Sequence, residues 1–379
     1  MNTSKILLHL SLIDGVGSAF IQKLVELIGV EALSSIYHFK ESDFIQIGIS
    51  QSRAQKLVQG LKDFDLLKKE LGLIELQNIK LLTLWCQNYP ERLKQISVPP
   101  VLLYCQGDSD LLLQEKLLAC VGSRLAHSYA RDSLYKIVIP MIQDGWIMVS
   151  GGALGADTYA HQMALDNNGK TIAVMGSGLC HQYPEKNKPL FRSILNAGGL
   201  LISSFSMMTR PDVYTFPIRN RIISGISVGC FVLQAAAKSG ALITAQYALD
   251  QGREVFALPG PIYDPLSDGC HDLIKSGAKL VTKTQDILDE LLPHLQNKEI
   301  RGEIIDARKM PEVVLEESFA DQFVDPINAL ILQHTLQAVT TDDLSRILSI
   351  DLDLLHEKLF HLSLDGKIEQ DCMGLWKIK

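Results

Sequence analysis

Two arginines and an asparagine interrupt the apolar run Phe216-Pro217-Ile218-Arg219-Asn220-Arg221-Ile222-Ile223-Ser224-Gly225. Burying an unpaired guanidinium group costs a large free energy, so arginines within an apolar run predict anionic partners. These partners are either carboxylates of the same chain, in a purely structural ion pair, or phosphate groups of a ligand. Glycine-rich turns elsewhere in the chain favour the phosphate interpretation.

Five glycine-rich or basic turns are expected at the carboxyl edge of one sheet, which is where ligands bind in doubly wound folds. Glycine lets the backbone approach an oxyanion closely, and exposed N–H groups then hold it. One mononucleotide would need only two such turns, so five predict a longer phosphate-binding rim. The turns are Val121-Gly122-Ser123-Arg124, Ser150-Gly151-Gly152-Ala153-Leu154-Gly155-Ala156-Asp157, Gly176-Ser177-Gly178, Arg219-Asn220-Arg221 and Lys238-Ser239-Gly240-Ala241-Leu242-Ile243-Thr244.

Motifs for cofactors and catalysis do not occur in the sequence. Gly151-Gly152-x-x-Gly155 is not the dinucleotide fingerprint. The complete P-loop pattern is also absent, because Ala164 stands where the triplet Gly169-Lys170-Thr171 would need the first glycine. No cluster of His, Cys, Asp or Glu has metal-ligand spacing. Asp157 and His161 have the spacing for general-base chemistry, but we favour a structural role, in which Asp157 caps its helix and His161 bonds a neighbouring loop. We therefore expect no cofactor, no metal and no catalytic residue.

The elements that would position these turns alternate strictly along the chain. Near-continuous apolar runs separated by helical patterns are typical of a parallel sheet that is covered on both faces. The fold class is therefore α/β, with a doubly wound, mostly parallel Rossmann-like sheet. The predicted strands are Leu117–Val121, Ile147–Ser150, Thr171–Gly176, Leu200–Phe205, Val228–Gln234 and Glu254–Pro259, and the predicted helices include Ala156–Asp166, Lys188–Ala197 and Ala241–Gln251.

The flanking segments predict further domains. Residues 1–70 suggest a small helical domain with two helix-hairpin-helix-like units, which either contact DNA backbone or bind nothing. Residues 71–295 form the α/β domain, and the charged, weakly periodic residues 296–325 suggest a linker. Residues 326–379, with three helical runs closed by a hairpin, suggest a winged helix. Its third helix begins with acidic residues, so we expect a protein contact or a structural role there rather than DNA reading.

Composition indicates a cytoplasmic protein. Seven cysteines are scattered without a C-x-x-C pair, which fits a reducing compartment. No apolar run has the length of a membrane span, and the N-terminus carries no signal-peptide pattern. The net charge of −7 arises from residues 291–379, which hold nine basic and sixteen acidic side chains. The α/β region is balanced in charge and can still carry a local basic groove.

The ordered motifs resemble the DNA-processing protein A (DprA/Smf) family over essentially the whole chain. The densest part of the resemblance runs from Tyr89-Pro90 to Gly277-Ala278. The motifs are Val121-Gly122-Ser123-Arg124, Ser150-Gly151…Gly155…Asp157…Ala160-His161, Tyr183-Pro184, Phe216-Pro217-x-Arg219-Asn220-Arg221-Ile222-Ile223, Ser239-Gly240-x-x-Ile243-Thr244-Ala245 and Arg253-Glu254-Val255-Phe256-x-x-Pro259-Gly260.

The resemblance implies a bacterial protein of natural transformation, without a settled enzymatic activity. Such a protein binds and protects incoming single-stranded DNA, forms a homodimer through the Rossmann-like domain and helps to load RecA recombinase. Arg124 and Arg219 are the leading phosphate contacts, whereas Asn220 and Arg221 either contact DNA or brace the groove. The expected DNA-binding residues are Gly122, Ser123, Arg124, Gly151, Gly152, Phe216, Arg219, Asn220, Arg221, Lys238, Ser239 and Gly240, with Asp157, His161 and Thr244 as structural support.

Phe216 is expected either to stack on bases or to belong to the core, and Lys238 to add a phosphate contact. Three positions depart from the family pattern. Leu154 replaces a common basic residue, which predicts weaker binding with a smaller salt dependence. Gln234 and Ser204 replace common glutamates, so Arg219 or Arg221 loses a carboxylate partner and catalysis becomes less favoured.

Two other functions stay open. A nucleotide-processing hydrolase of a related α/β fold would use the rim for one nucleotide, with Asp157 assisting cleavage of a glycosidic bond. An interaction scaffold with weakened DNA binding is suggested by Leu154 and the acidic C-terminal region.

Overall fold

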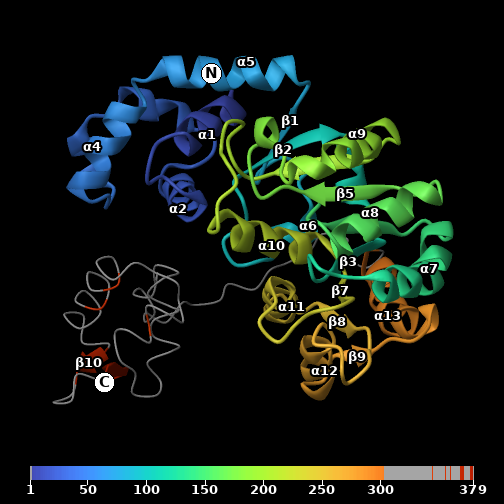
Figure 1. Cartoon of the computed structure of the whole chain (residues 1–379). Coiled ribbons are helices and arrows are strands. Elements are labelled where there is room, and N and C mark those ends of the chain that lie inside the picture. Colours follow the sequence, from blue (N-terminus) through green and yellow to red (C-terminus); the bar gives the residue numbers. More distant parts are fainter. Residues whose placement is uncertain are drawn as a thin grey trace. The chain divides into compact units, whose positions relative to one another are not determined.

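The computed structural model describes residues 2–302 and, beyond them, residues 344, 355, 359, 368–370 and 376–378. The chain divides into two compact units, Met1–Ile305 and Asp306–Lys379. Figure 1 shows the elements of the first unit.

A nine-stranded sheet forms the centre of the first unit, in the order β1-β2-β6-β5-β4-β3-β7-β8-β9. In this order, the strands from β6 through β5, β4, β3, β7 and β8 to β9 are parallel to their neighbours. At the other edge, β2 pairs antiparallel with both β1 and β6. The predicted doubly wound, mostly parallel sheet is therefore confirmed. The strands are β1 (Lys80–Thr83), β2 (Leu102–Gly107), β3 (Leu117–Val121), β4 (Ile147–Ser150), β5 (Thr171–Val174), β6 (Leu200–Ser203), β7 (Gly229–Val232), β8 (Glu254–Ala257) and β9 (Lys279–Leu280).

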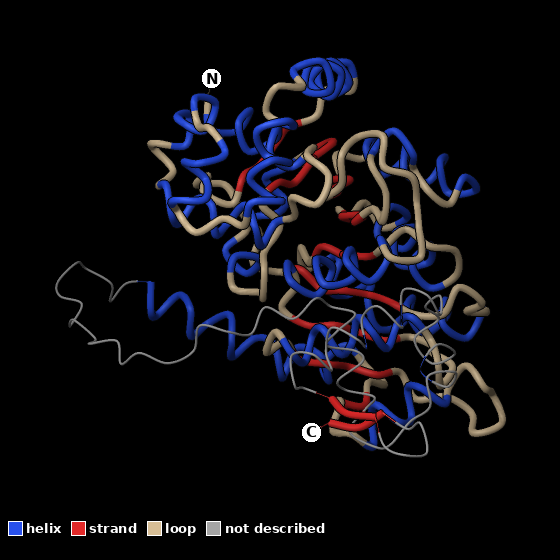
Figure 2. The backbone as a smooth tube through the Cα atoms, turned by 90° about the vertical axis from the view of Figure 1, so that its left-hand side faces the viewer, coloured by secondary structure: helices blue, strands red, loops and turns tan. Residues whose placement is uncertain are grey.

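Helices cover both faces of this sheet. Strand β3 is apolar throughout because both of its faces are buried under helices. Successive side chains of a strand point to opposite faces. Leu117, Ala119 and Val121 accordingly join a core with α10, α11 and α12, whereas Leu118 and Cys120 join a core with α7, α8 and α13. Figure 2 shows the strands lying between helices. The helices are α7 (Ser128–Gln143), α8 (Ala156–Asp166), α9 (Lys188–Asn196), α10 (Thr215–Ile226), α11 (Gly240–Asp250), α12 (Asp268–Lys275) and α13 (Thr284–Gly302).

The sheet order reverses at β3. This strand pairs with β4 on one side and with β7 on the other, so the chain proceeds in opposite directions from it. At such a switch point the loops after the two strands separate, and a crevice forms at the carboxyl edge. The turns that follow β3 and β7 are therefore the ones best placed to hold a ligand.

One predicted turn is wrong. The Arg219-Asn220-Arg221 segment was expected as a turn on the sheet edge, but it lies inside α10 (Thr215–Ile226). Pro217 does not break this helix, because it falls in the first helical turn, where the missing N–H group has no intrahelical acceptor to lose. The arginines are thus held on a rigid helix rather than on a loop.

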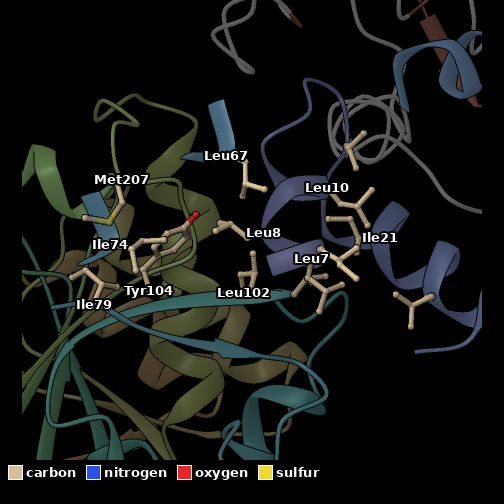
Figure 3. Packing of buried hydrophobic residues seen from close by; sticks show 14 of the residues in the cluster. Leu7, Leu8, Leu10, Ile21, Leu67, Ile74, Ile79, Leu102, Tyr104 and Met207 are labelled. Atoms are coloured by element: carbon tan, nitrogen blue, oxygen red, sulfur yellow. The ribbon is translucent and has the colours of Figure 1, made fainter. Parts of the chain in front are cut away.

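Five helices precede the sheet and share a core with it. Figure 3 shows Leu7 and Leu8 of α1 and Leu67 of α5 beside Leu102 and Tyr104 of β2. Residue 70 lies within α5, and the division of the first unit at this residue stays a prediction. The helices are α1 (Thr3–Ser11), α2 (Ser18–Ile28), α3 (Glu41–Gln46), α4 (Gln51–Gly60) and α5 (Phe64–Leu76), and the short α6 (Glu91–Lys94) lies between β1 and β2.

Little of the second unit belongs to the described residues. Its strands β10 (Ile368–Gln370) and β11 (Trp376–Ile378) pair antiparallel, as expected of the predicted hairpin. The predicted helical runs lie almost entirely outside the described residues, so the winged helix stays a prediction. In the first unit, α13 continues to Gly302, into the segment expected as a linker. Among the helices that the structure describes, none combines the length and apolar character that a membrane crossing requires.

Candidate nucleic-acid interface

The turns after β3, β4 and β7 pack tightly at the carboxyl edge of the sheet. The Ser123 N–H group donates to the Gln234 carbonyl at 2.6 Å, which joins the turn after β3 to the segment after β7. Gly155 has φ +75°, and a Cβ atom there would lie 2.5 Å from the Ser123 carbonyl oxygen. Only glycine fits this approach. The predicted Gly122–Arg124 turn is therefore held between the segments that follow β4 and β7.

Arg124 extends from this turn as an exposed cation. Its guanidinium carbon lies 5.3 Å from the centroid of the half-buried Phe216 ring, and that of Arg219 lies 5.8 Å from the same centroid. A guanidinium within about 6 Å of an aromatic centroid is attracted by the negative face of the ring. Phe216 therefore contacts both arginines, and Arg124 is the one that solvent or a ligand can reach.

Arg219 has its own partners inside the protein. It is only 5% exposed, and its Nη1 atom donates to the carbonyl oxygens of Gly151 and Val174. Burial lowers the pKa of Arg219 to about 10, while Asp157 acts in the opposite direction. The side chain thus joins the ends of β4 and β5. The expected phosphate contact by Arg219 stays a prediction, and these hydrogen bonds give it a bracing role.

Gly151 is required by this brace. A Cβ atom at Gly151 would lie 2.2 Å from Nη1 of Arg219. This is far inside contact distance, so any other residue would displace the guanidinium. The predicted glycine turn after β4 therefore has an intramolecular purpose besides any approach to phosphate.

Arg221 and Asn220 also have internal partners. Nη1 of Arg221 donates to the carbonyl oxygens of Ser97 and Val98, which precede β2. Burial lowers the pKa of Arg221. Asn220 accepts a hydrogen bond from Nε of Arg219 at 3.1 Å. Of the two alternatives expected for these residues, the contacts favour internal bracing.

Asp157 and His161 are buried parts of the same scaffold. Oδ2 of Asp157 accepts from the N–H groups of Gly151 at 3.1 Å and Ala153 at 3.2 Å. Burial raises the pKa of Asp157, although Arg219 and these N–H groups oppose the shift. Nδ1 of His161 bonds the Thr171 hydroxyl at 2.7 Å, and burial lowers the pKa of His161 to about 3. The expectation that Asp157 caps its helix is wrong, because the N–H groups that donate to it precede α8. His161 bonds a strand residue, so the expectation of a loop partner is wrong as well.

The turn before α11 is open to solvent. Lys238 and Gly240 are exposed, and Ser239 caps the helix by accepting from the Ala241 N–H group at 3.3 Å. Thr244 is buried further along α11. A helix N-terminus with a neighbouring lysine favours anions. Lys238 thus stands on the β7 side of the switch point, opposite Arg124.

Gln234 shows a network that the sequence did not predict. Its Oε1 atom accepts from the His127 N–H group at 3.1 Å, and its Nε2 atom donates to Asp264 at 3.0 Å. Gln234 thus has partners of its own, and the carboxylate that acts on Arg219 is Asp157. No local spacing could have signalled this network, because its members follow three different strands.

Two further neighbours of the rim were also missed. The Tyr183 ring lies 6.0 Å from that of Phe216 and is 43% exposed. Glu70 of α5 accepts from the Met207 N–H group at 2.7 Å and so supports the loop after β6 from the N-terminal helices. Leu154, expected as a lost basic contact, is partly exposed in the turn after β4.

These features define a Rossmann-like α/β protein with a glycine-rich, cation-bearing rim at the carboxyl edge of its sheet. The model of the DNA recombination-mediator protein A family matches residues 80–292, which is more than half of the chain. The chain belongs to this family, as the resemblance predicted.

Relatives and solved structures agree with the assignment. The chain is 47% identical over 202 residues to the DNA processing protein DprA of Streptococcus pneumoniae, covering 53% of this chain and 71% of the relative. It is 39% identical over 215 residues to DprA of Bacillus subtilis, covering 57% and 72%. The X-ray structure of S. pneumoniae DprA superposes with a TM-score of 0.67 at 37% identity, over 77% of this chain and 99% of that one.

A second solved structure concerns DprA of Helicobacter pylori and is described as giving insight into its single-stranded DNA binding mode. It matches with a TM-score of 0.51 at 29% identity, over 57% of this chain and 98% of that chain.

Proposed function

We propose that this protein binds single-stranded DNA along the carboxyl edge of its sheet, without reading the base sequence. The observation that carries the proposal is Arg124, an exposed guanidinium on a glycine-supported turn beside the Phe216 ring. Cationic side chains hold phosphates, and aromatic faces stack on unpaired bases of any type. The single-strand binding described for the H. pylori relative supports the same chemistry here.

The rim residues divide into contacts and supports. Arg124 and Lys238 are exposed on either side of the switch point and hold phosphates, together with the N–H groups of the glycine turns. Arg219 and Asp157 are buried and fix the turn after β4. A phosphate held between fixed turns needs little rearrangement of the protein, which lowers the entropic cost of binding.

The biological role that we propose is DNA processing in natural transformation. In this role the protein protects incoming single strands, acts as a homodimer and helps to load RecA recombinase. The family description as a recombination mediator and the DprA names of the relatives support it. We further propose a cytoplasmic location.

The burial and the hydrogen bonds of Asp157 favour a binding role over hydrolysis. This carboxylate is 6% exposed, and the N–H groups of Gly151 and Ala153, in the turn that precedes it, donate to it. A general base must reach its substrate within hydrogen-bond distance. Asp157 instead supports the turn, so we propose that the protein is not an enzyme.

Fluorescence anisotropy with a labelled poly-dT strand tests the proposal, using duplex DNA of equal length as competitor. Binding should weaken as salt rises from about 50 to about 200 mM, because each phosphate contact releases counterions. Duplex should displace the strand poorly, because paired bases offer no free aromatic contact. Binding that duplex displaces as well as single strand would contradict the proposal.

A further inference from the structure

Ile262 and Tyr263 are almost fully exposed on the loop that follows β8. They are 90% and 87% exposed, more than any other large apolar side chain in the part of the chain that the structure describes. A single exposed apolar residue is common and assigns no role. This pair, however, lies on a loop that is fixed by hydrogen bonds and stands at the carboxyl edge of the sheet.

The loop is held in one conformation by hydrogen bonds on both sides of Tyr263. The Asp264 N–H group donates to the Pro261 carbonyl at 3.0 Å, and the Ser267 N–H group donates to the Asp264 carbonyl at 2.8 Å. His271 of α12 bonds the Gly260 carbonyl at 2.9 Å. An exposed ring on a fixed backbone loses little conformational entropy when it contacts a ligand.

The same loop is joined to the turn that carries Arg124. Oδ2 of Asp264 lies 3.0 Å from Nε2 of His127 and accepts from Gln234 at the same distance. The Tyr129 hydroxyl donates to the Pro259 carbonyl. His127 belongs to the segment between β3 and α7, which also carries Arg124. Asp264, the residue next to Tyr263, thus joins this loop to the segment that carries Arg124, the proposed DNA contact.

Sheet order then places Tyr263 and Phe216 on opposite sides of Arg124. Phe216 packs on Gly176 in the turn after β5, whereas Tyr263 follows β8. In the sheet, β3 lies between these two strands, and β7 with the Lys238 turn lies between β3 and β8. The edge therefore presents an aromatic ring, two cations and a second aromatic ring in that order.

We propose that Tyr263 is a second stacking platform for a nucleobase, at the end of the rim remote from Phe216. This inference rests on the proposed single-strand binding and extends it from phosphates to a second base. A strand held by Arg124 and Lys238 continues over the loop after β8, where its unpaired base stacks on the phenol ring. Ile262 flanks the ring and covers the edge of the base.

The test compares Tyr263→Ala with wild type in anisotropy titrations with labelled poly-dT. Loss of one base–aromatic stack should raise the Kd about fivefold to a hundredfold. The slope of log K against log salt should stay the same, since no phosphate contact is lost. Tyr263→Phe keeps the ring and should restore most of the affinity, whereas Tyr263→Leu keeps only apolar bulk and should not. Tyr135→Ala, on α7 and 65% exposed, is the matched control and should bind as wild type does.

A strand with abasic sites in place of the bases separates stacking from other roles. Wild type should lose affinity for it relative to poly-dT, and Tyr263→Ala should lose less. Unchanged poly-dT binding by Tyr263→Ala, or an equal loss with the abasic strand in both proteins, would overturn the inference while wild-type binding still upheld the proposed function. A wild type that binds no poly-dT would remove both. A lower sedimentation mass for Tyr263→Ala would assign the ring to a contact between copies and also overturn it.

Discussion

The Arg124 guanidinium carbon lies 5.3 Å from the centroid of the Phe216 ring, although the turn after β3 and helix α10 are far apart in the sequence. Arg219 lies 5.8 Å from the same centroid, but only Arg124 is exposed. One aromatic ring thus lies close to both an exposed cation and a buried one. We infer that Phe216 keeps Arg124 oriented toward the rim before DNA arrives.

Phe216→Leu tests this orientation. Leucine preserves apolar bulk on α10 but removes the π face, so the cation–π contribution of about 0.5–1 kcal/mol is lost. Single-strand affinity should fall by at least about twofold, and by more where a base also stacks on the ring. Anisotropy titrations measure the change, with Phe64→Leu on α5 as the control. Equal affinity for Phe216→Leu and wild type would show that the ring neither orients Arg124 nor stacks.

Gly151→Ala should displace Arg219, because the new Cβ atom would lie 2.2 Å from Nη1. Overpacking of this kind costs about 1–3 kcal/mol, so we expect lower stability in urea together with weaker DNA binding. Gly72→Ala is the matched control. No atom lies within 4 Å of its added Cβ, and Gly72 lies in α5, so alanine should raise the stability by about 0.5–1 kcal/mol. A Gly151→Ala protein as stable as wild type would contradict the bracing role of Arg219.

Acid should destabilise the protein through His161. Burial lowers its pKa in the folded protein to about 3, from an ordinary value of 6.5. Below pH 6.5 the unfolded chain therefore binds a proton that the folded protein does not. Stability from this group is complete above pH 6.5 and is lost by about 1.4 kcal/mol per pH unit as pH falls toward 3.

Urea unfolding of wild type and His161→Gln across this pH range checks the prediction. Burial also lowers the pKa of His9. The difference in unfolding free energy between the two proteins therefore separates the contribution of His161 from that of His9. We expect the free energy of unfolding to fall more steeply with acid in wild type. Parallel curves would mean that His161 titrates normally in the folded protein.

The parallel strands of the sheet and the helices between them could be predicted from the sequence. Strands such as Leu117–Val121 are buried on both faces, so their apolar runs are continuous and easy to recognise. The parallel direction of the strands follows because a helix separates each strand from the next. Glycine turns after these strands then had to meet at one edge, which located Gly122–Arg124 and Lys238–Gly240 without any structure.

Which arginine is buried as a brace and which is exposed for binding could not be predicted from the sequence. Arg219 and Arg124 share the same chemistry, and only packing decides that Arg219 caps carbonyl groups of β4 and β5 while Arg124 stays exposed. Long-range networks such as Gln234 with Asp264 leave no trace in local spacing.

The salt dependence of single-strand binding by Arg124→Ala tests the central claim most directly. Wild type, Arg124→Ala and the control Arg131→Ala, another exposed arginine of the first unit, are titrated with labelled poly-dT at several salt concentrations. Loss of one phosphate contact should weaken binding by about 1–3 kcal/mol and reduce the slope of log K against log salt by about 0.7. Arg131→Ala should match wild type in both. An Arg124→Ala protein with wild-type affinity and slope would show that single-stranded DNA does not bind at this rim.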